Sequence, residues 1–340
     1  MIIESTINPG VCEEVAVPLL EKHSGMKLGE GFEVAHCPER INPGDTKWNV
    51  YNIPRNVGAS SLKATKIVAD FYRSFLSSEV NEVSSLKVAE ATKIIENTFR
   101  DINIAYVNEL AKSFDLLGID LVETMHAAAN KPFAFMPHFP GCGVGGHCIP
   151  VDPYYLIARA ETAGFQHKFL KMAREVNNSM PKYTVAKAVK ALNDAELPVK
   201  GTKILLYGLS YKANVGDLRE SPALKIKKEL VSWGADVVCY DPYLLEDSDV
   251  RSLSEGLDQV QAIVIATDHK EIKEFKFSSC DHVRVIIDGR NCLDNTTLPN
   301  HVNYLGIGRG IAARQLKEGV RVNHPEEAYN SESIVQEMVN

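Results

Sequence analysis

The sequence lacks several features that mark whole classes of protein. No apolar run approaches the roughly 18 to 20 residues that a membrane-spanning helix needs, so we expect no membrane span. The first residues show no basic region followed by an apolar core, so we expect no secretory signal. The formal charge of −7 over 340 residues is opposite to the basic excess typical of nucleic-acid-binding proteins. We therefore expect neither membrane nor nucleic acid as a partner.

A disulfide framework and a zinc-binding spacing are also lacking. The seven cysteines are odd in number and dispersed along the chain, as in proteins of a reducing compartment, which predicts a cytoplasmic location. Two groups of possible ligands, His36 with Cys37 and Cys142 with His147 and Cys148, match no standard zinc spacing. We predict no metal site.

The order of apolar patterns predicts an α/β protein in several parts. An α/β pattern opens the chain abruptly, with a strand-like run at 32–35, and looks like the tail of a larger domain. Residues 86–117 contain no Pro or Gly and predict a long helix that ends at Gly118. After Pro198, strands alternate with helices, which predicts a doubly wound parallel sheet. We expect an α/β segment at 1–83, a helical middle domain at 84–197, a Rossmann-like domain at 198–315 and a tail at 316–340.

The most informative segment is 140–152, a loop rich in glycine and proline. Its glycines let the backbone turn tightly and approach a ligand, and they present Cys148 four residues before the carboxylate of Asp152. A thiol in such a loop is typical of a nucleophile. The alternative is a surface loop with an incidental cysteine.

Further candidate groups lie elsewhere in the chain. Lys93 and Asn97 are one turn apart on the long helix and can stabilise an oxyanion, or form part of a solvated helix face. Glu39 follows a strand, where active groups of α/β sheets often lie. Residues 208–222 join a strand to a helix start, which suits a phosphate, and Asp241 ends the next strand, where a ribose-binding acid often lies.

Taken together, these segments resemble the UDP-glucose/GDP-mannose 6-dehydrogenase family. The matching segments follow the family order over nearly the whole chain: Glu4-Ser5-Thr6, Cys37-Pro38-Glu39-Arg40, Lys93 with Asn97, Gly145-Gly146-His147-Cys148 with Asp152, 208–221, and Asp288-Gly289-Arg290. His147, 151–155 and 38–44 are similar to the branch that acts on UDP-N-acetylhexosamines. The UDP-glucose branch usually has a lysine at the position of Val151.

The resemblance implies an NAD-dependent oxidation of C6 of a UDP-sugar through a cysteine thiohemiacetal and thioester, with UDP-N-acetyl-D-mannosamine as the favoured substrate. It implies six catalytic residues: Cys148 as nucleophile, Lys93 and Asn97 at the oxyanion, Asp152 and Thr6 at the water, and Glu39 as general base. Substrate-binding residues implied in the same way are Arg40, Gly145, His147, Tyr154, Lys212 and Arg290. Arg219 is implied to contact the cofactor, the 198–315 domain to hold UDP, and the helical middle domain to form a homodimer.

One departure from the family pattern is the absence of the closely spaced glycines that bind NAD. We therefore expect residues 1–83 to be the remnant of an N-terminal Rossmann domain that is largely missing, with Ile2, Ile3 and Val34 left uncovered. Alternatives remain open: UDP-glucose, UDP-GlcNAc or UDP-GalNAc as substrate, an inactive nucleotide-sugar-binding or dimerisation module, or an enzyme completed by a separate NAD-domain chain.

Overall fold

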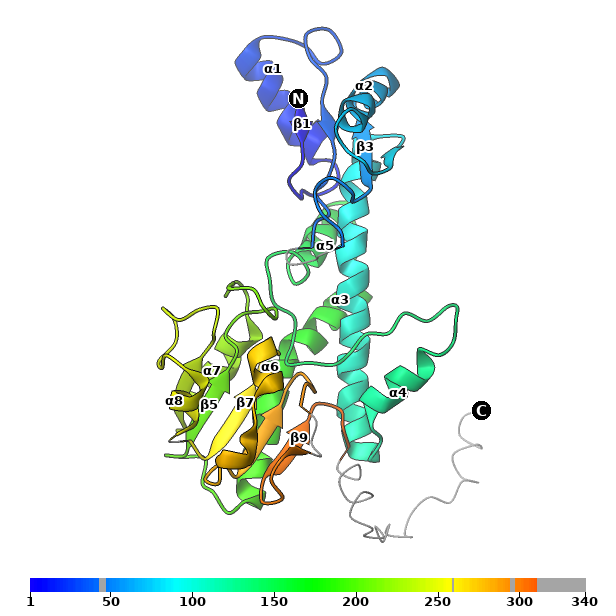
Figure 1. Ribbon diagram of the computed structural model, residues 1–340. Coiled ribbons are helices and arrows are strands. Elements are labelled where there is room, and N and C mark those ends of the chain that lie inside the picture. Colours follow the sequence, from blue (N-terminus) through cyan, green and yellow to red (C-terminus); the bar gives the residue numbers. More distant parts are fainter. Residues whose placement is uncertain (43–46, 259, 294–296, 311–340) are drawn as a thin grey trace, which may run out of the picture.

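The computed structural model describes residues 1–42, 47–258, 260–293 and 297–310, so the expected tail at 316–340 lies outside the described residues. Helix α3 (Leu86–Leu117) forms the long axis of the molecule, with an N-terminal lobe at one end and the C-terminal sheet beside the other (Figure 1). The hydroxyl of Ser85 caps the start of α3 by accepting from Val88 N–H, and Gly118 ends it in the left-handed region at φ 70°. The predicted bounds of this helix are confirmed.

The N-terminal lobe, residues 1–82, is a small mixed sheet with short helices. Its strand order is β1 (Ile2–Ile3), β2 (Ala35–His36), β3 (Arg55–Ala59) and β4 (Val80–Glu82), and only the β2–β3 pair is antiparallel. Its helices are a π-helix, η1 (Cys12–Ala16), followed by α1 (Val17–Ser24) and α2 (Leu62–Arg73).

Two expectations for this lobe are wrong. The strand expected at 32–35 begins only at Ala35, because β1 is too short to pair with more than two residues. Val34 is not uncovered: its side chain is fully buried in a cluster with Cys12, Val17 and Leu86. The first residue of α3 therefore helps to cover the face that we expected to be bare.

Three helices pack around α3 in the middle of the chain: α4 (Leu121–Ala128), α5 (Asp152–Thr162) and α6 (Lys168–Asp194). A buried ion pair between Asp101 of α3 and Arg174 of α6 lies at the contact of these two long helices. Helix α5 begins at Asp152, because Pro153 fits the first turn of a helix, where its missing N–H costs nothing.

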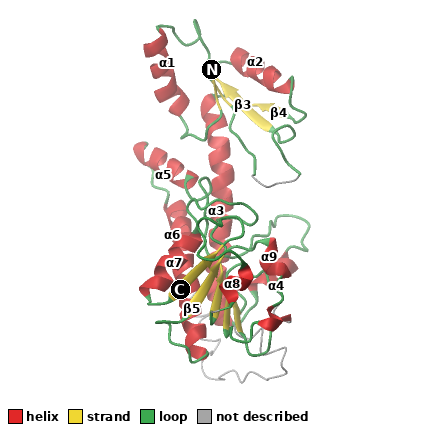
Figure 2. Ribbon diagram, turned by 60° about the vertical axis from the view of Figure 1, so that its left-hand side comes forward, coloured by secondary structure: helices red, strands yellow, loops and turns green. Residues whose placement is uncertain are grey.

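The C-terminal lobe, residues 198–310, is a parallel sheet with helices on both faces (Figure 2). Its strand order is β6 (Asp236–Tyr240), β5 (Lys203–Tyr207), β7 (Ala262–Ile265), β8 (Val285–Asp288) and β9 (Asn303–Gly306). Alternate side chains pack under α6 and α7 (Pro222–Ser232) on one face, and under α8 (Leu253–Leu257), α9 (Lys270–Glu274) and η2 (Phe277–Ser279) on the other. The predicted α/β class, with a helical middle and a C-terminal parallel sheet, is confirmed.

Within the described part of the chain, no helix combines the length and the apolar character required to cross a bilayer.

Candidate active site

A cavity of about 780 Å³ lies where the N-terminal lobe, α3 and the C-terminal sheet meet. Nine of the residues implied by the resemblance line it: Glu39, Arg40, Lys93, Asn97, Gly145, His147, Cys148, Lys212 and Arg290. They come from distant parts of the chain, which the long helix and the parallel sheet bring to one place. A concave site with convergent polar groups is the usual form of an active site.

The other four implied residues do not line the cavity. Asp152 lies directly behind its wall, where its carboxylate accepts a hydrogen bond of 2.5 Å from the Asn97 amide. Arg219 forms an exposed ion pair with Asp217 at 2.6 Å. The guanidinium of Arg174 lies over the ring of Tyr154, 6.0 Å from the centre of that ring. Thr6 is half-buried in the segment between β1 and η1.

The glycine loop is held closely against Tyr211, which explains its composition. A Cβ placed on Gly145 would lie 2.6 Å from Tyr211 Cβ, and one on Gly146 would lie 2.9 Å from the Tyr211 ring. Gly146 also has φ +90°, a conformation that side chains other than glycine rarely adopt. Two residues later, the Cys148 carbonyl accepts from the N–H of Asp152 at 2.8 Å, which starts α5. The loop therefore fixes the thiol at the start of a helix.

The charges around Cys148 act on its thiol in opposite directions. Burial raises the pKa of Cys148, and the Asp152 carboxylate raises it further, whereas Lys93 and Arg219 lower it. The pKa of Asp152 is also raised by burial, against the hydrogen bond from Asn97 and the charge of Lys93. At neutral pH the thiol therefore stays largely protonated, and Lys93 is the cation that favours its thiolate most strongly.

Glu39 and Arg40 are each held by a partner at the cavity wall. Glu39 forms an ion pair of 2.9 Å with the buried guanidinium of Arg55, and accepts from Ile41 N–H at 2.7 Å. Arg40 pairs with Glu96 of α3 at 2.7 Å. The first contact lies within the N-terminal lobe, whereas the second connects the lobe to α3.

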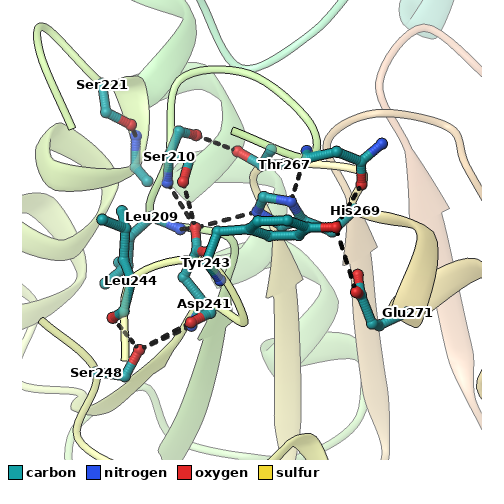
Figure 3. A network of polar contacts seen from close by, with 12 residues as sticks. Leu209, Ser210, Ser221, Asp241, Tyr243, Leu244, Ser248, Thr267, His269 and Glu271 are labelled. Atoms are coloured by element: carbon teal, nitrogen blue, oxygen red, sulfur yellow. Dashed lines mark hydrogen bonds and ion pairs between the residues drawn. The ribbon is translucent and has the colours of Figure 1, made fainter. Parts of the chain in front are cut away.

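Two acids, Asp241 directly after β6 and Asp288 at the end of β8, are internal supports, since each accepts hydrogen bonds from the protein itself. Asp241 is fully buried and accepts hydrogen bonds from backbone and side-chain donors of Leu209, Ser210 and His269 (Figure 3). Burial acts to raise its pKa, but the hydrogen bonds from His269 and Ser210 outweigh this and lower it to about 2. Because the carboxylate is engaged internally, we do not assign it to a ribose.

Arg290 follows β8 and reaches the cavity from that side. Its backbone N–H donates to the buried Asp288 at 3.0 Å, and its side chain lies 3.3 Å from the Asp268 carboxylate. A Cβ on Gly141 would lie 2.6 Å from Arg290 Nη1, so the guanidinium also touches the start of the glycine loop.

Sequence reasoning missed several residues of the cavity wall, including Glu96, Arg100, His138, Tyr211 and Asp268. Glu96 and Arg100 lie three and seven residues after Lys93 on the same helix, so helical periodicity would have found them. His138 and Asp268 lie in loops with no comparable signal.

Three family models cover most of the chain. The NAD-binding domain of the UDP-glucose/GDP-mannose dehydrogenase family matches residues 1–76, its central domain 87–179 and its UDP-binding domain 205–295. The chain is 38% identical to the UDP-N-acetyl-D-glucosamine 6-dehydrogenase of Pseudomonas aeruginosa, over 83% of this chain and 69% of that protein. It is 39% identical to the UDP-N-acetyl-D-mannosamine dehydrogenase of Pyrococcus horikoshii, over 91% and 72%.

The solved structures agree with these matches. A structure of the UDP-D-ManNAc dehydrogenase from Pyrococcus horikoshii superposes with a TM-score of 0.84 at 37% identity, covering 91% of this chain and 72% of that one.

The match at residues 1–76 corrects one expectation. We expected the NAD-binding half to be largely missing and the chain to be a fragment, because residues 1–83 contain no G-x-G-x-x-G. The family's NAD-binding domain is instead present at residues 1–76, and the interpretation as a truncated chain is not supported. The chain is an enzyme of the NAD-dependent UDP-glucose/GDP-mannose dehydrogenase family.

Proposed function

We propose that this enzyme oxidises the C6 alcohol of a UDP-N-acetylhexosamine to the carboxylate, with UDP-N-acetyl-D-mannosamine as its first substrate. The observation that carries this proposal is the meeting of Cys148, Lys93 and Asn97 at the cavity wall, with Asp152 bonded to Asn97 directly behind it. The names of the relatives support an acetamido sugar, since they act on UDP-N-acetyl-D-glucosamine or UDP-N-acetyl-D-mannosamine. Val151, where the UDP-glucose branch usually has a lysine, supports the same choice.

The substrate fits the charges of the cavity wall. Lys212 and Arg290 line the cavity at the carboxyl ends of the C-terminal strands, where ligands of parallel sheets bind. We assign them to the diphosphate, because guanidinium and ammonium groups are its usual partners. We assign Arg40, Gly145, His147 and Tyr154 to the sugar side of the site.

Cys148 acts as the nucleophile once the alcohol has been oxidised to an aldehyde. Its thiol first loses its proton to solvent; the thiolate sulfur then adds to the aldehyde carbon, and the resulting oxyanion is stabilised by the ammonium of Lys93 and the amide of Asn97. Loss of a second hydride leaves a thioester on the sulfur. Water then attacks the thioester and releases the carboxylate, with Glu39 taking the proton and Asp152 and Thr6 orienting the water.

NAD, when bound, accepts the hydride in each oxidation. The exposed guanidinium of Arg219, close enough to Cys148 to affect its pKa, would hold an anionic group of the cofactor. Residues 1–76 contain no G-x-G-x-x-G, so we assign none of them to the pyrophosphate.

We also propose that the enzyme is a cytoplasmic homodimer formed through its helical middle. Large apolar side chains are exposed on α3 and α6, among them Ile95 (60% exposed), Phe169 (67%) and Met172 (60%). Exposed apolar groups of this size on neighbouring helices are typical of a buried interface. Light scattering on the purified protein tests this part.

A panel of UDP-sugars assayed for NADH formation tests the function. We expect the highest kcat/KM with UDP-N-acetyl-D-mannosamine and at least a tenfold lower value with UDP-glucose, since the acetamido group must find its hydrogen-bond partners. Cys148→Ala should abolish turnover. Cys292→Ser is the matched control, because Cys292 is the other half-exposed cysteine of the described residues and lies outside the cavity wall. Binding of the sugars without turnover by the wild-type protein would contradict the proposal.

A further inference from the structure

The loop at 208–214, between β5 and α7, supplies Tyr211 and Lys212 to the cavity wall. Two fully buried side chains reach it from the strands on either side of β5: Asp241, directly after β6, and His269, shortly after β7. Both lie beneath the loop, in the polar network of Figure 3. Sequence patterns did not predict a role for His269, and they indicated Asp241 only as a candidate ribose-binding acid.

The start of the loop is tied to Asp241. One oxygen of its carboxylate accepts from Leu209 N–H, Ser210 N–H and the Ser210 hydroxyl, each at 2.8 Å. The Thr267 hydroxyl donates to the Ser210 carbonyl from the β7 side. The backbone of the loop is therefore fixed as it leaves β5.

The end of the loop is tied to His269. Asn214 N–H donates to His269 Nδ1 at 2.9 Å, and the opposite ring nitrogen, Nε2, lies 3.0 Å from the same Asp241 oxygen. Since Nδ1 accepts, Nε2 must carry the proton and donate to Asp241. The Tyr243 ring stacks on the imidazole at 4.9 Å between centres. One imidazole thus bridges the two ends of the loop through Asp241.

What the loop carries is directly coupled to the proposed nucleophile. Tyr211 packs against Gly145 and Gly146, so any shift of the loop moves the backbone two residues before Cys148. Gly146 N–H also donates to the Arg219 carbonyl at 2.9 Å, just beyond the same loop. A substitution of His269 should therefore affect the positions of both Lys212 and the Cys148 thiol.

We propose that His269, together with Asp241, is a positioning residue of the active site, whose imidazole holds the 208–214 loop so that Lys212 faces the nucleotide and Tyr211 supports the Cys148 loop. The role of Lys212 rests on the function proposed above, whereas the support of the Cys148 loop does not. The pair touches neither substrate nor cofactor and acts only through the loop.

Two substitutions at His269 separate this role from a general contribution to folding. In His269→Asn, the amide oxygen takes the place of Nδ1 and still accepts from Asn214 N–H, but cannot reach Asp241. In His269→Gln, the amide nitrogen takes the place of Nε2 and still donates to Asp241, but leaves Asn214 N–H without its acceptor. Because each variant loses one hydrogen bond of the same imidazole, we expect similar melting temperatures.

The two variants should differ in the site. We expect His269→Gln to bind UDP up to about tenfold more weakly by calorimetry, because the part-buried N–H of Asn214 loses its acceptor and a lost hydrogen bond costs about this much. His269→Asn keeps this acceptor, and the start of the loop keeps its own bonds to Asp241, so this variant should stay within about twofold of wild type. The rate at which iodoacetamide alkylates Cys148, read by peptide mass spectrometry, should change severalfold in His269→Gln alone. Ser248→Ala is the control, since Ser248 bonds Asp241 N–H and the Leu244 carbonyl on the side away from the loop.

Equal UDP affinity and equal alkylation in both His269 variants and wild type would overturn the proposal. So would losses in both variants that simply follow their melting temperatures. If the wild-type protein alkylates normally but neither binds UDP nor produces NADH, the proposed function fails, while the alkylation rates still decide whether His269 positions the loop.

Discussion

The C-terminal sheet consists of five parallel strands of four or five residues, each with buried side chains, whereas three of the four strands in the N-terminal lobe have only two or three residues. The C-terminal sheet has a large apolar cluster on each face. The N-terminal lobe has small apolar clusters, one of which includes the first turn of α3. One lobe carries its own core, and the other depends on the long helix.

The polar contacts show the same difference. In the N-terminal lobe the buried carboxylate of Glu90, on α3, accepts from the N–H groups of Gly10 and Cys12 and so ties the start of η1 to the helix. Glu39 and Arg40 reach the cavity through ion pairs with Arg55 and Glu96. The lobe that supplies the proposed general base is therefore positioned by few, specific contacts, and we expect it to open first.

The largest effect should appear in amide hydrogen exchange. We expect the amides of β5 and β7 to exchange on the order of a thousandfold more slowly than those of β1 and β2, because two-residue strands in a small sheet open locally while a buried parallel sheet opens only on global unfolding. Mass spectrometry of the native protein measures both regions in one experiment. Equal protection in the two sheets would show that they unfold as a unit.

A core substitution in the C-terminal sheet should weaken that lobe alone. Leu206 is fully buried in β5, and Leu206→Ala should lower the free energy of unfolding by about 2 to 5 kcal/mol through lost burial and a cavity. Urea denaturation measures the change. Leu224→Ala is the control, because Leu224 on α7 is 43% exposed and should cost far less. If Leu206→Ala raised the amide exchange rate of β3 as much as that of β5, the two lobes would not be separate in stability.

The thiol of Cys148 should respond to charge changes that leave both lobes intact. Asp152→Asn removes a negative charge that disfavours the thiolate, so the pKa of Cys148 should fall and alkylation should be faster below that pKa. Lys93→Met removes a favourable cation and should raise the pKa of Cys148. Lys93→Arg keeps the charge and serves as the control. The pH profile of iodoacetamide alkylation measures the pKa of Cys148 in each variant. A higher pKa in Asp152→Asn or a lower one in Lys93→Met would contradict the assigned charge effects.

Two capping residues give the smallest and most local test. Ser61 caps α2 in the N-terminal lobe and Ser221 caps α7 in the C-terminal lobe, each by accepting a backbone N–H. Each Ser→Ala change should cost about 1 kcal/mol. Ser61→Ala should speed exchange only in the N-terminal lobe, and Ser221→Ala only in the C-terminal lobe. Faster exchange in both lobes from either substitution would show that the two lobes open as one unit.

Local patterns predicted what local forces determine. The start of α3 follows from the cap at Ser85, and its end from the left-handed Gly118, both visible in the sequence. Strands β5 and β6 are apolar runs that pair over their full length, and both belong to the alternation of strands and helices predicted after Pro198. Strand β9 was missed, because Asn303–Gly306 is short and only partly apolar and is a strand only through pairing with β8.

The site was predictable in kind and less so in arrangement. The glycine loop pointed to Cys148 because a tight turn needs glycine, and helical spacing put Lys93 and Asn97 on one face of a helix; all three line the cavity. The partners of Arg40 and Glu39 were not visible, because Glu96 and Arg55 approach them only in the folded chain. The internal role of Asp241 was hidden for the same reason: a strand-end acid has the same sequence signal whether it binds a ribose or a histidine.

The central claim, that Cys148 carries one substrate through two successive oxidations, is tested most directly by the ratio of NADH formed to UDP-N-acetyl-D-mannosamine consumed. Limiting substrate with excess NAD, followed by absorbance and by chromatography of the sugar nucleotide, gives this ratio. The account predicts two NADH for each substrate, the uronate as the only product, and no turnover in Cys148→Ala. One NADH for each substrate with release of an aldehyde, or an unchanged ratio and rate in Cys148→Ala, would contradict it.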